Sequence, residues 1–250
     1  MKKEKLRILL IGYGKMGRAI EAIAAERGHT ISAIVSDKQI DISHICKAYQ
    51  PNIAFEFTSP AAAVSNLEAL IVAGIPTVCG STGWLEHWNS IVGLVQKEKG
   101  SLFYASNFSM GMNLLFKLTE IAGRFVKDLP EYEVSIEEIH HLEKKDIPSG
   151  TALTLADKLL IELSRKKSWV VNQPLPHSDS IHITALREPN IPGTHKIKFS
   201  SPIETVEMIH TAHSRMGFAD GAVRAGEWLM GKKGVFTMED FLHDRFSKTL

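Results

Sequence analysis

A glycine-rich segment between a short apolar run and a helical pattern places the strongest constraint on the fold. Gly12, Gly14 and Gly17 give a GxGxxG motif that follows the apolar residues 7–11 and precedes the helix-forming residues 18–26. In that context Gly12 would make the tight turn, Gly14 would admit a pyrophosphate, and Gly17 would let the helix pack against the strand. Glycines can also form a purely structural turn, but the flanking strand and helix favour nucleotide binding.

Strand-like and helical patterns then alternate along the first part of the chain. This alternation predicts an α/β fold, with an N-terminal Rossmann-type, doubly wound parallel sheet. The further strands are expected at residues 29–35, 53–57, 76–79 and 101–104, and the further helices at residues 61–73 and 85–99.

Polar or glycine-containing turns follow three of these predicted strands, at residues 58–60, 80–83 and 105–108. Ligands of open α/β sheets lie beyond the carboxyl ends of the strands. Each turn alone could be simple turn chemistry, but their recurrence favours contact with a cofactor.

The residues after the second predicted strand bear on the choice of nucleotide. Asp37 stands about twenty residues beyond the glycines, where an acid would hold the adenosine ribose hydroxyls. It favours NADH, because a carboxylate repels the 2′-phosphate of NADPH, although Ser36 and Lys38 could offset this preference. The same residues could instead form only a polar loop.

After Ser109 strands dominate, which predicts a second, α+β domain on a mixed or antiparallel sheet. An open face of such a sheet is often covered by another subunit. The C-terminal helical segment is expected to return to the first domain. The predicted dinucleotide-binding domain is therefore 1–106 with 217–250, and the predicted substrate-binding and oligomerisation domain is 107–216. The second domain's strands are expected at residues 132–139, 180–187, 194–199 and 204–213, and helices at 113–126 and after Thr151.

One connection in the second domain concentrates groups that can hold and protonate an anion. His140 and His141 follow a predicted strand and titrate nearest neutrality, and Lys144 or Lys145 can neutralise a carboxylate or donate a proton. Residues 149–151, Ser-Gly-Thr, begin a helix, whose unpaired N–H groups and dipole favour an anion. The alternative is an exposed charged loop capped by the serine.

The composition argues against several classes of protein. The chain has 250 residues, of which 44% are hydrophobic and 23% charged, and its net charge of +1 gives no support for binding nucleic acid or a membrane surface. No apolar run approaches the length of a membrane span. Cys46 and Cys79 form neither a disulfide framework nor a metal-ligand spacing, so we expect a cytoplasmic protein.

Other charged residues invite a metal or anion site. His195, His210 and His213 could form a metal site with the pair His140 and His141, but His210 and His213 lie three apart on an alternating strand and so point to opposite faces, and no cysteine accompanies them. We therefore predict no metal. Arg187 and Arg215 could meet a substrate carboxylate, although a surface or interface role is commoner for arginine.

Several segments, taken in order, resemble 4-hydroxy-tetrahydrodipicolinate reductase, the bacterial and plant enzyme family of lysine and diaminopimelate synthesis. The resemblance spans nearly the whole chain, and its most specific piece is the block from His140 to Thr151. The segments that carry it are Gly12-Tyr-Gly-Lys-Met-Gly17, Phe57-Thr-Ser-Pro60, Gly80-Ser-Thr-Gly83, Ser106-Asn-Phe-Ser109 with Gly111 and Asn113, His140-His-Leu-Glu-Lys-Lys-Asp-Ile-Pro-Ser-Gly-Thr151, and Ser214-Arg-Met-Gly-Phe-Ala-Asp-Gly-Ala222 with Trp228-Leu229.

The resemblance implies reduction of a cyclic dicarboxylate by NADH or NADPH with loss of water, in a homotetramer joined through the second domain's sheet. It implies that His140 and Lys144 are the catalytic proton donors or acceptors, without deciding which serves which step. The residues implied to bind the substrate are His141, Ser149, Gly150 and Thr151. The residues implied to contact the nucleotide are Gly12, Tyr13, Gly14, Lys15, Met16, Gly17, Asp37, Gly80, Ser81, Thr82, Ala105, Ser106, Asn107 and Phe108.

The chain departs from the usual family pattern outside the proposed catalytic block. The connection from Asp37 to Ile53 lacks a loop that many members carry, and the glycine loop is one residue shorter than in some. Arg187-Glu188-Pro189 replaces an Arg-x-Gly sequence, while Gly193 and His195 are retained.

Two other functions stay open from the residues alone. Another two-domain NAD(P)-dependent oxidoreductase, such as an amino-acid dehydrogenase, would share the glycines but leave residues 140–151 unexplained. A nucleotide-sensing protein with this fold and no chemistry would be expected to have lost its acid groups, whereas His140, Lys144 and Thr151 are all present.

Overall fold

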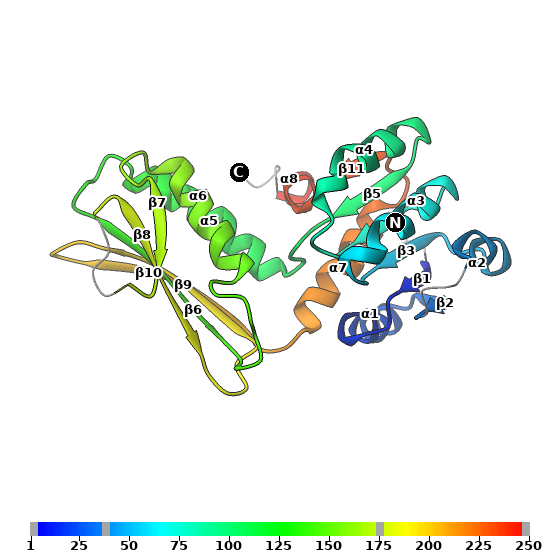
Figure 1. Ribbon diagram of the computed structural model, residues 1–250, viewed down its shortest axis with the longest axis horizontal. Helices are drawn as coiled ribbons and strands as arrows, with labels where there is room; N and C mark the ends of the chain where they lie inside the picture. The colour runs from blue at the N-terminus through cyan, green and yellow to red at the C-terminus, as the bar shows by residue number, and fades with distance from the viewer. Residues whose placement is uncertain (1–4, 37–40, 174–177, 247–250) are drawn as a thin grey trace. The chain divides into compact units, whose positions relative to one another are not determined.

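The structure is a computed structural model that describes residues 5–36, 41–173 and 178–246 (Figure 1). The chain divides into two compact units. The first comprises residues 1–109 with 216–250, and the second comprises residues 110–215. Each unit has its own sheet and its own hydrophobic core.

The first unit is built on a six-stranded sheet in the order β11-β5-β4-β3-β1-β2, with every neighbouring pair parallel. The strands β1 and β3 are almost entirely buried, as expected for a parallel sheet that is covered on both faces. This sheet confirms the predicted Rossmann-type part of the fold. The strands are β1 (Arg7–Ile11), β2 (Thr30–Val35), β3 (Ile53–Glu56), β4 (Thr77–Cys79), β5 (Ser101–Tyr104) and β11 (Gly234–Phe236).

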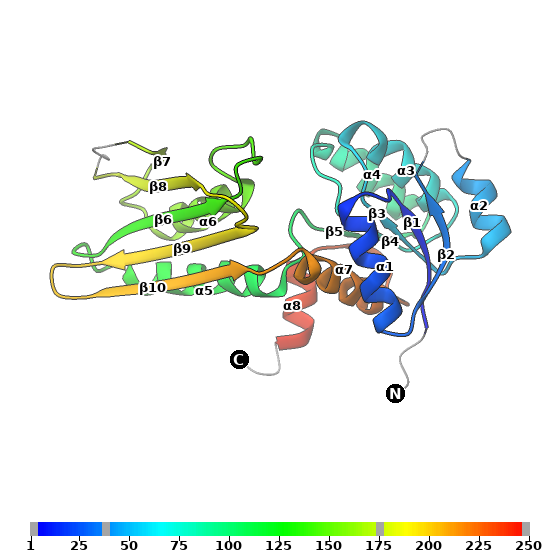
Figure 2. The ribbon, with the colours of Figure 1, turned by 90° about the horizontal axis from the view of Figure 1, so that it is seen from below.

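Helices cover both faces of this sheet. Helices α1 and α7 pack together on one face, and α2, α3 and α4 lie along the other (Figures 1 and 2). Right-handed crossovers account for α1 on one face and α2 to α4 on the other, because the chain runs from β1 to β2 in one direction along the sheet and from β2 through β3 and β4 to β5 in the opposite direction. The helices are α1 (Lys15–Glu26), α2 (Ile42–Tyr49), α3 (Pro60–Val72), the short 3₁₀ helix η1 (Leu85–His87), α4 (Trp88–Lys97), α7 (Met216–Leu229) and α8 (Met238–Phe246).

The second unit is a five-stranded mixed sheet in the order β10-β9-β6-β8-β7. Strand β6 lies at its centre, parallel to β8 and antiparallel to β9, and helices α5 and α6 pack on one face. This arrangement confirms the predicted α+β architecture. The elements are α5 (Met110–Val126), β6 (Glu133–His140), α6 (Gly150–Glu162), β7 (Ser168–Val171), β8 (Ser180–Arg187), β9 (Gly193–Ser200) and β10 (Thr205–Ala212).

The alternating sequence of the second sheet explains how it sorts its side chains. In β9 every second residue is buried, and Ile197 and Phe199 pack under the helices with Leu155 and Leu159 of α6. The intervening residues of β9 face away from the helices and are partly exposed. The same alternation places His140 on the helix-covered face of β6.

Three elements differ from the sequence-based expectation. Helix α2 forms where only a short connection was expected, because the Asp41 side chain accepts hydrogen bonds from the N–H groups of Ser43 and His44 and caps it. Strand β7 is a four-residue edge strand without an alternating apolar pattern strong enough to predict it. Strand β11 joins the first sheet beside β5, where the sequence indicated only a packing segment.

Among the residues that the structure describes, no helix combines the length and apolar character needed to cross a membrane.

Candidate active site

The GxGxxG segment forms the close turn between β1 and α1. Gly12 has a φ of +91°, and a Cβ added there would lie 2.1 Å from the carbonyl oxygen of Phe57. A Cβ added at Gly17 would lie 2.3 Å from the carbonyl oxygen of Gly12. Both contacts are far shorter than real Cβ contacts, so these two positions require glycine for the fold itself.

Gly14 has a different role in the same turn. It is the N-cap residue of α1 and makes no capping hydrogen bond with a side chain, and the first turn of α1 contains no acidic residue. A Cβ added at Gly14 would meet no protein atom within 4 Å. An open helix start without a carboxylate fits the pyrophosphate of a dinucleotide, which such N–H groups bind.

The other predicted cofactor segments lie at the ends of neighbouring strands, around Phe57. The N–H of Thr58 donates to Ser81 Oγ at 2.7 Å, and a Cβ added at Gly80 would lie 2.1 Å from the Phe57 ring. The rings of Phe57 and Phe108 are 5.7 Å apart. The structure therefore brings the turns after β1, β3, β4 and β5 together at one edge of the sheet.

The remaining predicted cofactor residues, apart from Asp37, lie in these turns or in the first turn of α1. The Tyr13 hydroxyl donates to Glu21, and Lys15 is exposed at the start of α1. Asp37 lies outside the described residues. The others, Met16, Thr82, Ala105, Ser106 and Asn107, occupy the turns already described or the first turn of α1.

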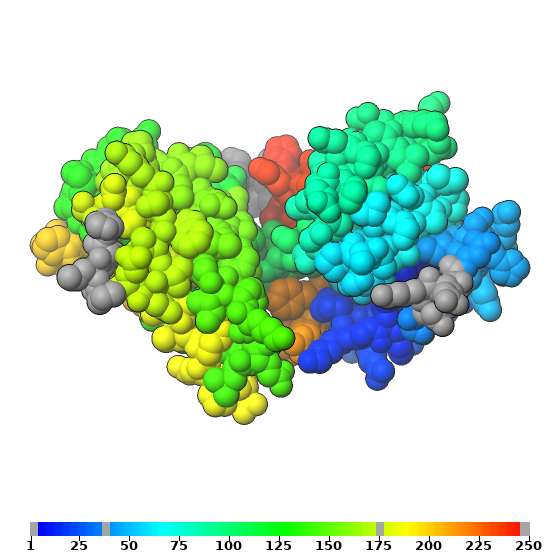
Figure 3. Space-filling model, viewed as in Figure 1, coloured from blue at the N-terminus to red at the C-terminus, as the bar shows by residue number. Residues whose placement is uncertain are grey.

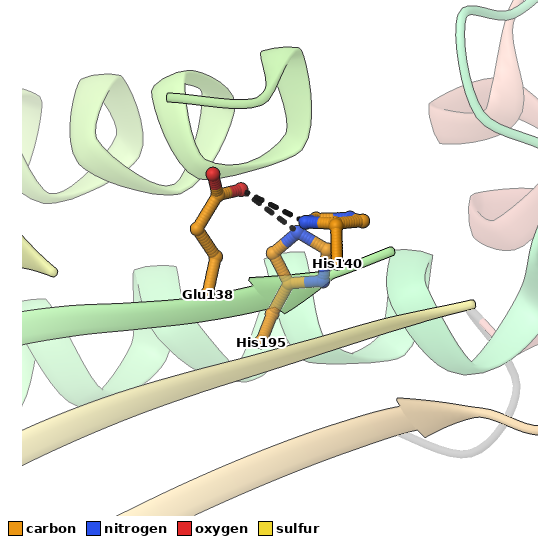
Figure 4. Close-up of side chains that lie close together, drawn as sticks. All are labelled: Glu138, His140 and His195. Atoms are coloured by element: carbon orange, nitrogen blue, oxygen red, sulfur yellow. Dashed lines mark ion pairs between the residues drawn. The ribbon is translucent and has the colours of Figure 1, made fainter. Parts of the chain in front are cut away.

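A second cluster forms at the end of β6. Glu138 and His140 lie two residues apart on its helix-covered face, and His195 pairs opposite Glu138 on β9. All three are buried, with exposed fractions of 0%, 7% and 5%. Figure 4 shows both imidazoles directed at the carboxylate of Glu138.

His140 is held against this carboxylate through its buried nitrogen. Its Nδ1 lies 3.4 Å from Glu138 Oε2, close enough for an ion pair but not aligned as a hydrogen bond. Burial lowers the pKa of His140, and the nearby Lys144 and Arg187 also lower it, whereas the charge of Glu138 opposes this shift. The neutral form of His140 is therefore favoured.

His195 occupies a still more enclosed position. Its Nε2 lies 3.3 Å from Ser149 Oγ and 3.8 Å from Glu138 Oε2, and its ring packs edge-on against His140 at a centroid distance of 5.0 Å. Burial, reinforced by the neighbouring His140 and His210, lowers the pKa of His195 to about 3. This imidazole is therefore neutral near pH 7.

The connection after β6 carries Lys144 and is fastened by Arg187. Lys144 Nζ lies 2.8 Å from both carboxylate oxygens of Asp146. Burial tends to raise the pKa of Asp146, but its hydrogen bond from Lys144 lowers it. Arg187 donates to the carbonyl oxygens of Lys144 and Asp146 at 3.2 and 2.5 Å, and to Glu138 Oε1 at 3.2 Å.

These contacts place the connection after β6 beside the β8–β9 connection. In the space-filling view the two connections, green and yellow, lie together at one end of the second unit (Figure 3). Lys144 keeps 23% of its side chain exposed there. Its ammonium group is thus accessible and already neutralised by one carboxylate.

The start of α6 completes the cluster. Ser149 is its N-cap, with Oγ accepting from Ala152 N–H at 3.2 Å, while its own N–H donates to Glu138 Oε1 at 3.0 Å. A Cβ added at Gly150 would meet no protein atom within 4 Å, and Thr151 follows in the first turn. No acidic residue occupies that turn, so the helix start suits a carboxylate ligand.

His141 follows His140 at the end of β6, and its Nδ1 is buried without a hydrogen-bond partner among the described residues. The structure thus gathers the predicted residues His140, His141, Lys144, Ser149, Gly150 and Thr151 on one strand end, one connection and one helix start.

Three residues of the cluster, Glu138, His195 and Arg187, were not predicted as site residues from the sequence. Glu138 stands on the same face as Val134 and Ile136, so the alternation of β6 was a signal that this carboxylate is buried. A buried carboxylate needs partners, and this requirement was the available signal. Arg187 was considered only as a surface or substrate-binding arginine, whereas it binds Glu138 and the connection.

The same cluster contains the residues that come nearest to a metal site. His195 lies opposite His210 in the pairing of β9 with β10, but among the described residues the group whose ligand atoms all lie within 4.8 Å of one another is Glu138, His140 and His195. Such a trio could hold a metal ion. However, the carboxylate already accepts from Arg187 and from the Ser149 N–H, and a guanidinium beside a metal ion is electrostatically unfavourable.

Replacing Gly193 by alanine is expected to lower activity by on the order of 10-fold and also to lower the unfolding temperature, because its φ of +159° is strained for alanine. The added Cβ would lie 3.0 Å from Nε2 and 3.1 Å from Cδ2 of His140, so the ring must move away from β9. Steady-state kinetics and thermal unfolding would check this. Unchanged kcat in a normally folded variant would show that the ring position is not critical.

The unfolding free energy is expected to fall as the pH is lowered from about 6.5 towards 3, by up to about 1.4 kcal/mol per unit from His195 alone. The unfolded chain takes up this proton near pH 6.5, whereas the folded protein does so only near 3, so acid favours unfolding. Urea denaturation at several pH values would measure the slope.

His195→Gln should lose this part of the slope, while His44→Gln, at an exposed position on α2, should keep it. Equal slopes in the wild type and His195→Gln would contradict the assignment.

Comparison with known proteins gives a consistent result along the chain. Residues 6–108 match the family described as "Dihydrodipicolinate reductase, N-terminus", and residues 111–242 match "Dihydrodipicolinate reductase, C-terminus". A 4-hydroxy-tetrahydrodipicolinate reductase from Christiangramia forsetii is 43% identical over 242 residues, which cover 96% of this chain and 99% of the relative. One from Methanosarcina mazei is 34% identical, covering 81% and 77%.

Solved structures show the same fold. A dipicolinate-bound dihydrodipicolinate reductase from Paenisporosarcina sp. TG-14 superposes with a TM-score of 0.79 at 21% identity, covering 94% of this chain and 98% of that one. An amine dehydrogenase from Mycobacterium smegmatis gives a TM-score of 0.59 at 9% identity, covering 93% and 94%.

Proposed function

We propose, since this chain belongs to the dihydrodipicolinate reductase family, that His140 and Lys144 carry the proton chemistry of that family's reaction in this protein. The chain reduces 4-hydroxy-tetrahydrodipicolinate with a nicotinamide dinucleotide, in the synthesis of diaminopimelate and lysine. The observation that carries our residue assignment is the grouping of a buried imidazole, an accessible ammonium and an open helix start between β6 and α6.

The substrate is a small cyclic dicarboxylate, which we propose binds at the start of α6. The family relative from Paenisporosarcina was solved with dipicolinate, a ligand of the same chemical class. Gly150 leaves the helix start accessible, and Thr151 and His141 add polar groups beside it. Lys144 would pair with a carboxylate of the substrate in exchange for Asp146.

The protons of the reaction then have two candidate carriers. Loss of the ring hydroxyl as water needs an acid, and arrival of a hydride at the ring needs a positive charge near the dicarboxylate. Lys144 can donate a proton, or keep it and hold a positive charge near the carboxylates, and His140 can accept or release a proton. We leave open which of the two serves which step.

The bound dinucleotide supplies the hydride, and we propose that the turn from Gly12 to Gly17 holds its pyrophosphate. The turns around Phe57, at Gly80–Thr82 and Ala105–Phe108, would contact the rest of the cofactor. We propose NADH as the preferred form, on the basis of Asp37, which lies outside the described residues.

We further propose a homotetramer joined through the sheet face that α5 and α6 leave uncovered. Ile209 of β10 is 57% exposed on that face, and Glu137 and Lys196 form an ion pair there at 3.1 Å. The free cysteines Cys46 and Cys79 support a cytoplasmic location.

The test of this function is oxidation of NADH and NADPH by the purified protein, with the substrate generated in the cuvette from pyruvate and aspartate semialdehyde by a synthase. We expect consumption only when the synthase is present, faster with NADH than with NADPH. If neither cofactor is consumed although both bind, the reductase activity is wrong. If NADPH is preferred, only the assignment to Asp37 falls.

A further inference from the structure

We propose that Glu138 is the positioning residue of His140, holding its ring so that Nδ1 carries the proton and Nε2 is offered to the substrate. The role of His140 in the reaction rests on the function proposed above. The tautomer and orientation that Glu138 imposes on His140 do not rest on that function, because they follow from contacts within the second unit.

The first step is that His140 can meet the substrate only through Nε2. Its Nδ1 atom is fully buried and has no aligned hydrogen-bond partner among the described residues. The nearest group to Nδ1 that could satisfy it is Glu138 Oε2, at 3.4 Å. Hydrogen bonds of catalytic groups are often long in the unliganded protein and tighten when the substrate binds.

The second step is that an ionised carboxylate can only accept hydrogen bonds. Nδ1 of a neutral imidazole must therefore carry the proton to gain from Glu138, and this leaves Nε2 unprotonated. With the opposite tautomer two acceptors would face each other in a buried site, which is unfavourable because neither gains a hydrogen bond. The same carboxylate would stabilise the ring when it takes up a proton at Nε2.

The third step concerns what holds Glu138 itself. Its side chain is 0% exposed, so its orientation is fixed by its partners. The Ser149 N–H donates to both of its oxygens, at 3.0 Å to Oε1 and 3.2 Å to Oε2, and Arg187 Nη2 donates to Oε1 at 3.2 Å. Held in this way, the carboxylate presents Oε2 to the two imidazoles of His140 and His195, at 3.4 and 3.8 Å.

The contacts of Arg187 link this carboxylate to the second proton carrier. Arg187 also binds the carbonyl oxygens of Lys144 and Asp146. The connection that carries the ammonium group and the carboxylate that orients the imidazole therefore share one guanidinium. A planar guanidinium can make these contacts together, whereas an ammonium group cannot.

The charges around His140 determine how its titration should respond to a change at Glu138. The groups that face it are Glu138 on β6, His195 on β9, Arg187 on β8, and Lys144 and Asp146 in the connection. Burial has the largest effect and lowers the pKa of His140, and Glu138 is the main group that raises it. Removing the charge of Glu138 should therefore shift the His140 titration to lower pH.

The first experiment measures the tautomer directly, in the whole wild-type protein labelled with 15N in its histidines. Long-range 1H–15N spectra distinguish Nδ1–H from Nε2–H imidazoles, and the signals of His140 are identified by their loss in His140→Gln. We expect the Nδ1–H tautomer near neutral pH. An Nε2–H tautomer would overturn the proposal, whatever reaction the protein catalyses.

The second experiment compares Glu138→Gln with the wild type in the coupled assay across pH. We expect kcat to fall on the order of 10²-fold, KM to change little, and the limb of the pH profile that belongs to His140 to move to lower pH. Glu138→Asp, which keeps the charge but withdraws it by one methylene, should recover part of kcat and most of the pH profile.

Glu162→Gln is the matched control. It removes a carboxylate that pairs with Arg124 at 2.9 Å at the opposite end of α6, so it should leave kcat and the pH profile unchanged. If Glu138 merely anchored α6, Glu138→Gln would lower the unfolding temperature but leave the tautomer and the pH limb in place. That result would overturn the proposal. If Glu138→Gln fails to fold, Glu138→Asp and the wild-type tautomer decide.

Discussion

Replacing Lys144 by methionine is expected to lower kcat by on the order of 10³-fold without unfolding the protein. Methionine keeps much of the length of the side chain but removes the charge and all three N–H donors. The ammonium group of Lys144 is partly exposed and its only acidic partner among the described residues is Asp146, itself more than half exposed. Little folding energy therefore depends on it.

Lys145→Met provides the matched control for this prediction. Lys145 is the next residue in the same connection and is exposed, and the proposed mechanism assigns the proton transfer to Lys144 and not to Lys145. We expect wild-type kcat in this variant. Steady-state kinetics with NADH and thermal unfolding of both variants would be measured together. Equal kcat in Lys144→Met and the wild type would remove Lys144 from the mechanism and leave His140 as the candidate for both protons.

Replacing Gly12 by alanine is expected to abolish dinucleotide binding and to destabilise the first unit by about 2 kcal/mol or more. The left-handed φ of +91° is unfavourable for alanine, and the new Cβ would lie 2.1 Å from the carbonyl oxygen of Phe57. That oxygen belongs to the backbone and cannot move without displacing the end of β3. Calorimetric titration with NADH and thermal unfolding would measure both effects.

Variants at two other glycines distinguish an effect on stability from an effect on dinucleotide binding. Gly14→Ala should keep the stability of the wild type, because its Cβ would meet no protein atom within 4 Å, but should bind NADH more weakly if the pyrophosphate lies there. Gly93→Ala, in the middle of α4 and equally unobstructed, should leave NADH binding unchanged and raise the stability by about 0.5–1 kcal/mol. Tight binding by Gly12→Ala would contradict the assignment of this turn.

The first unit was largely predictable from the sequence because its signals are local. A strand, three glycines and a helix in succession leave few alternatives, and runs such as Arg7–Ile11 are typical of strands buried on both faces. Helix α2 was missed because its eight residues contain only Ile42 and Cys46 as buried residues, and the cap at Asp41 was not recognised. Short helices depend on such caps more than on periodicity.

The candidate site was predictable in part for a different reason. The residues of the connection and the start of α6 are consecutive, so a single stretch of sequence contained them. Glu138 lies two residues before His140 in the sequence, but its partners His195 and Arg187 lie on β9 and β8, the two strands that pair with β6. The sequence contains each of these residues, whereas the contacts between them depend on strand order and register, which single-sequence patterns do not determine.

The central place of β6 in its sheet has a consequence for how this site can vary. Both neighbours of β6 constrain it, and its side chains alternate, so one inserted residue before Glu138 would turn Glu138 and His140 to the opposite face. The next eight residues, 141–148, lie outside the strand, so their side chains need not alternate between the two faces of the sheet. Insertions in this connection can therefore change the substrate preference without displacing Glu138 or His140. A shift of register in β6, in contrast, would displace both of these side chains together.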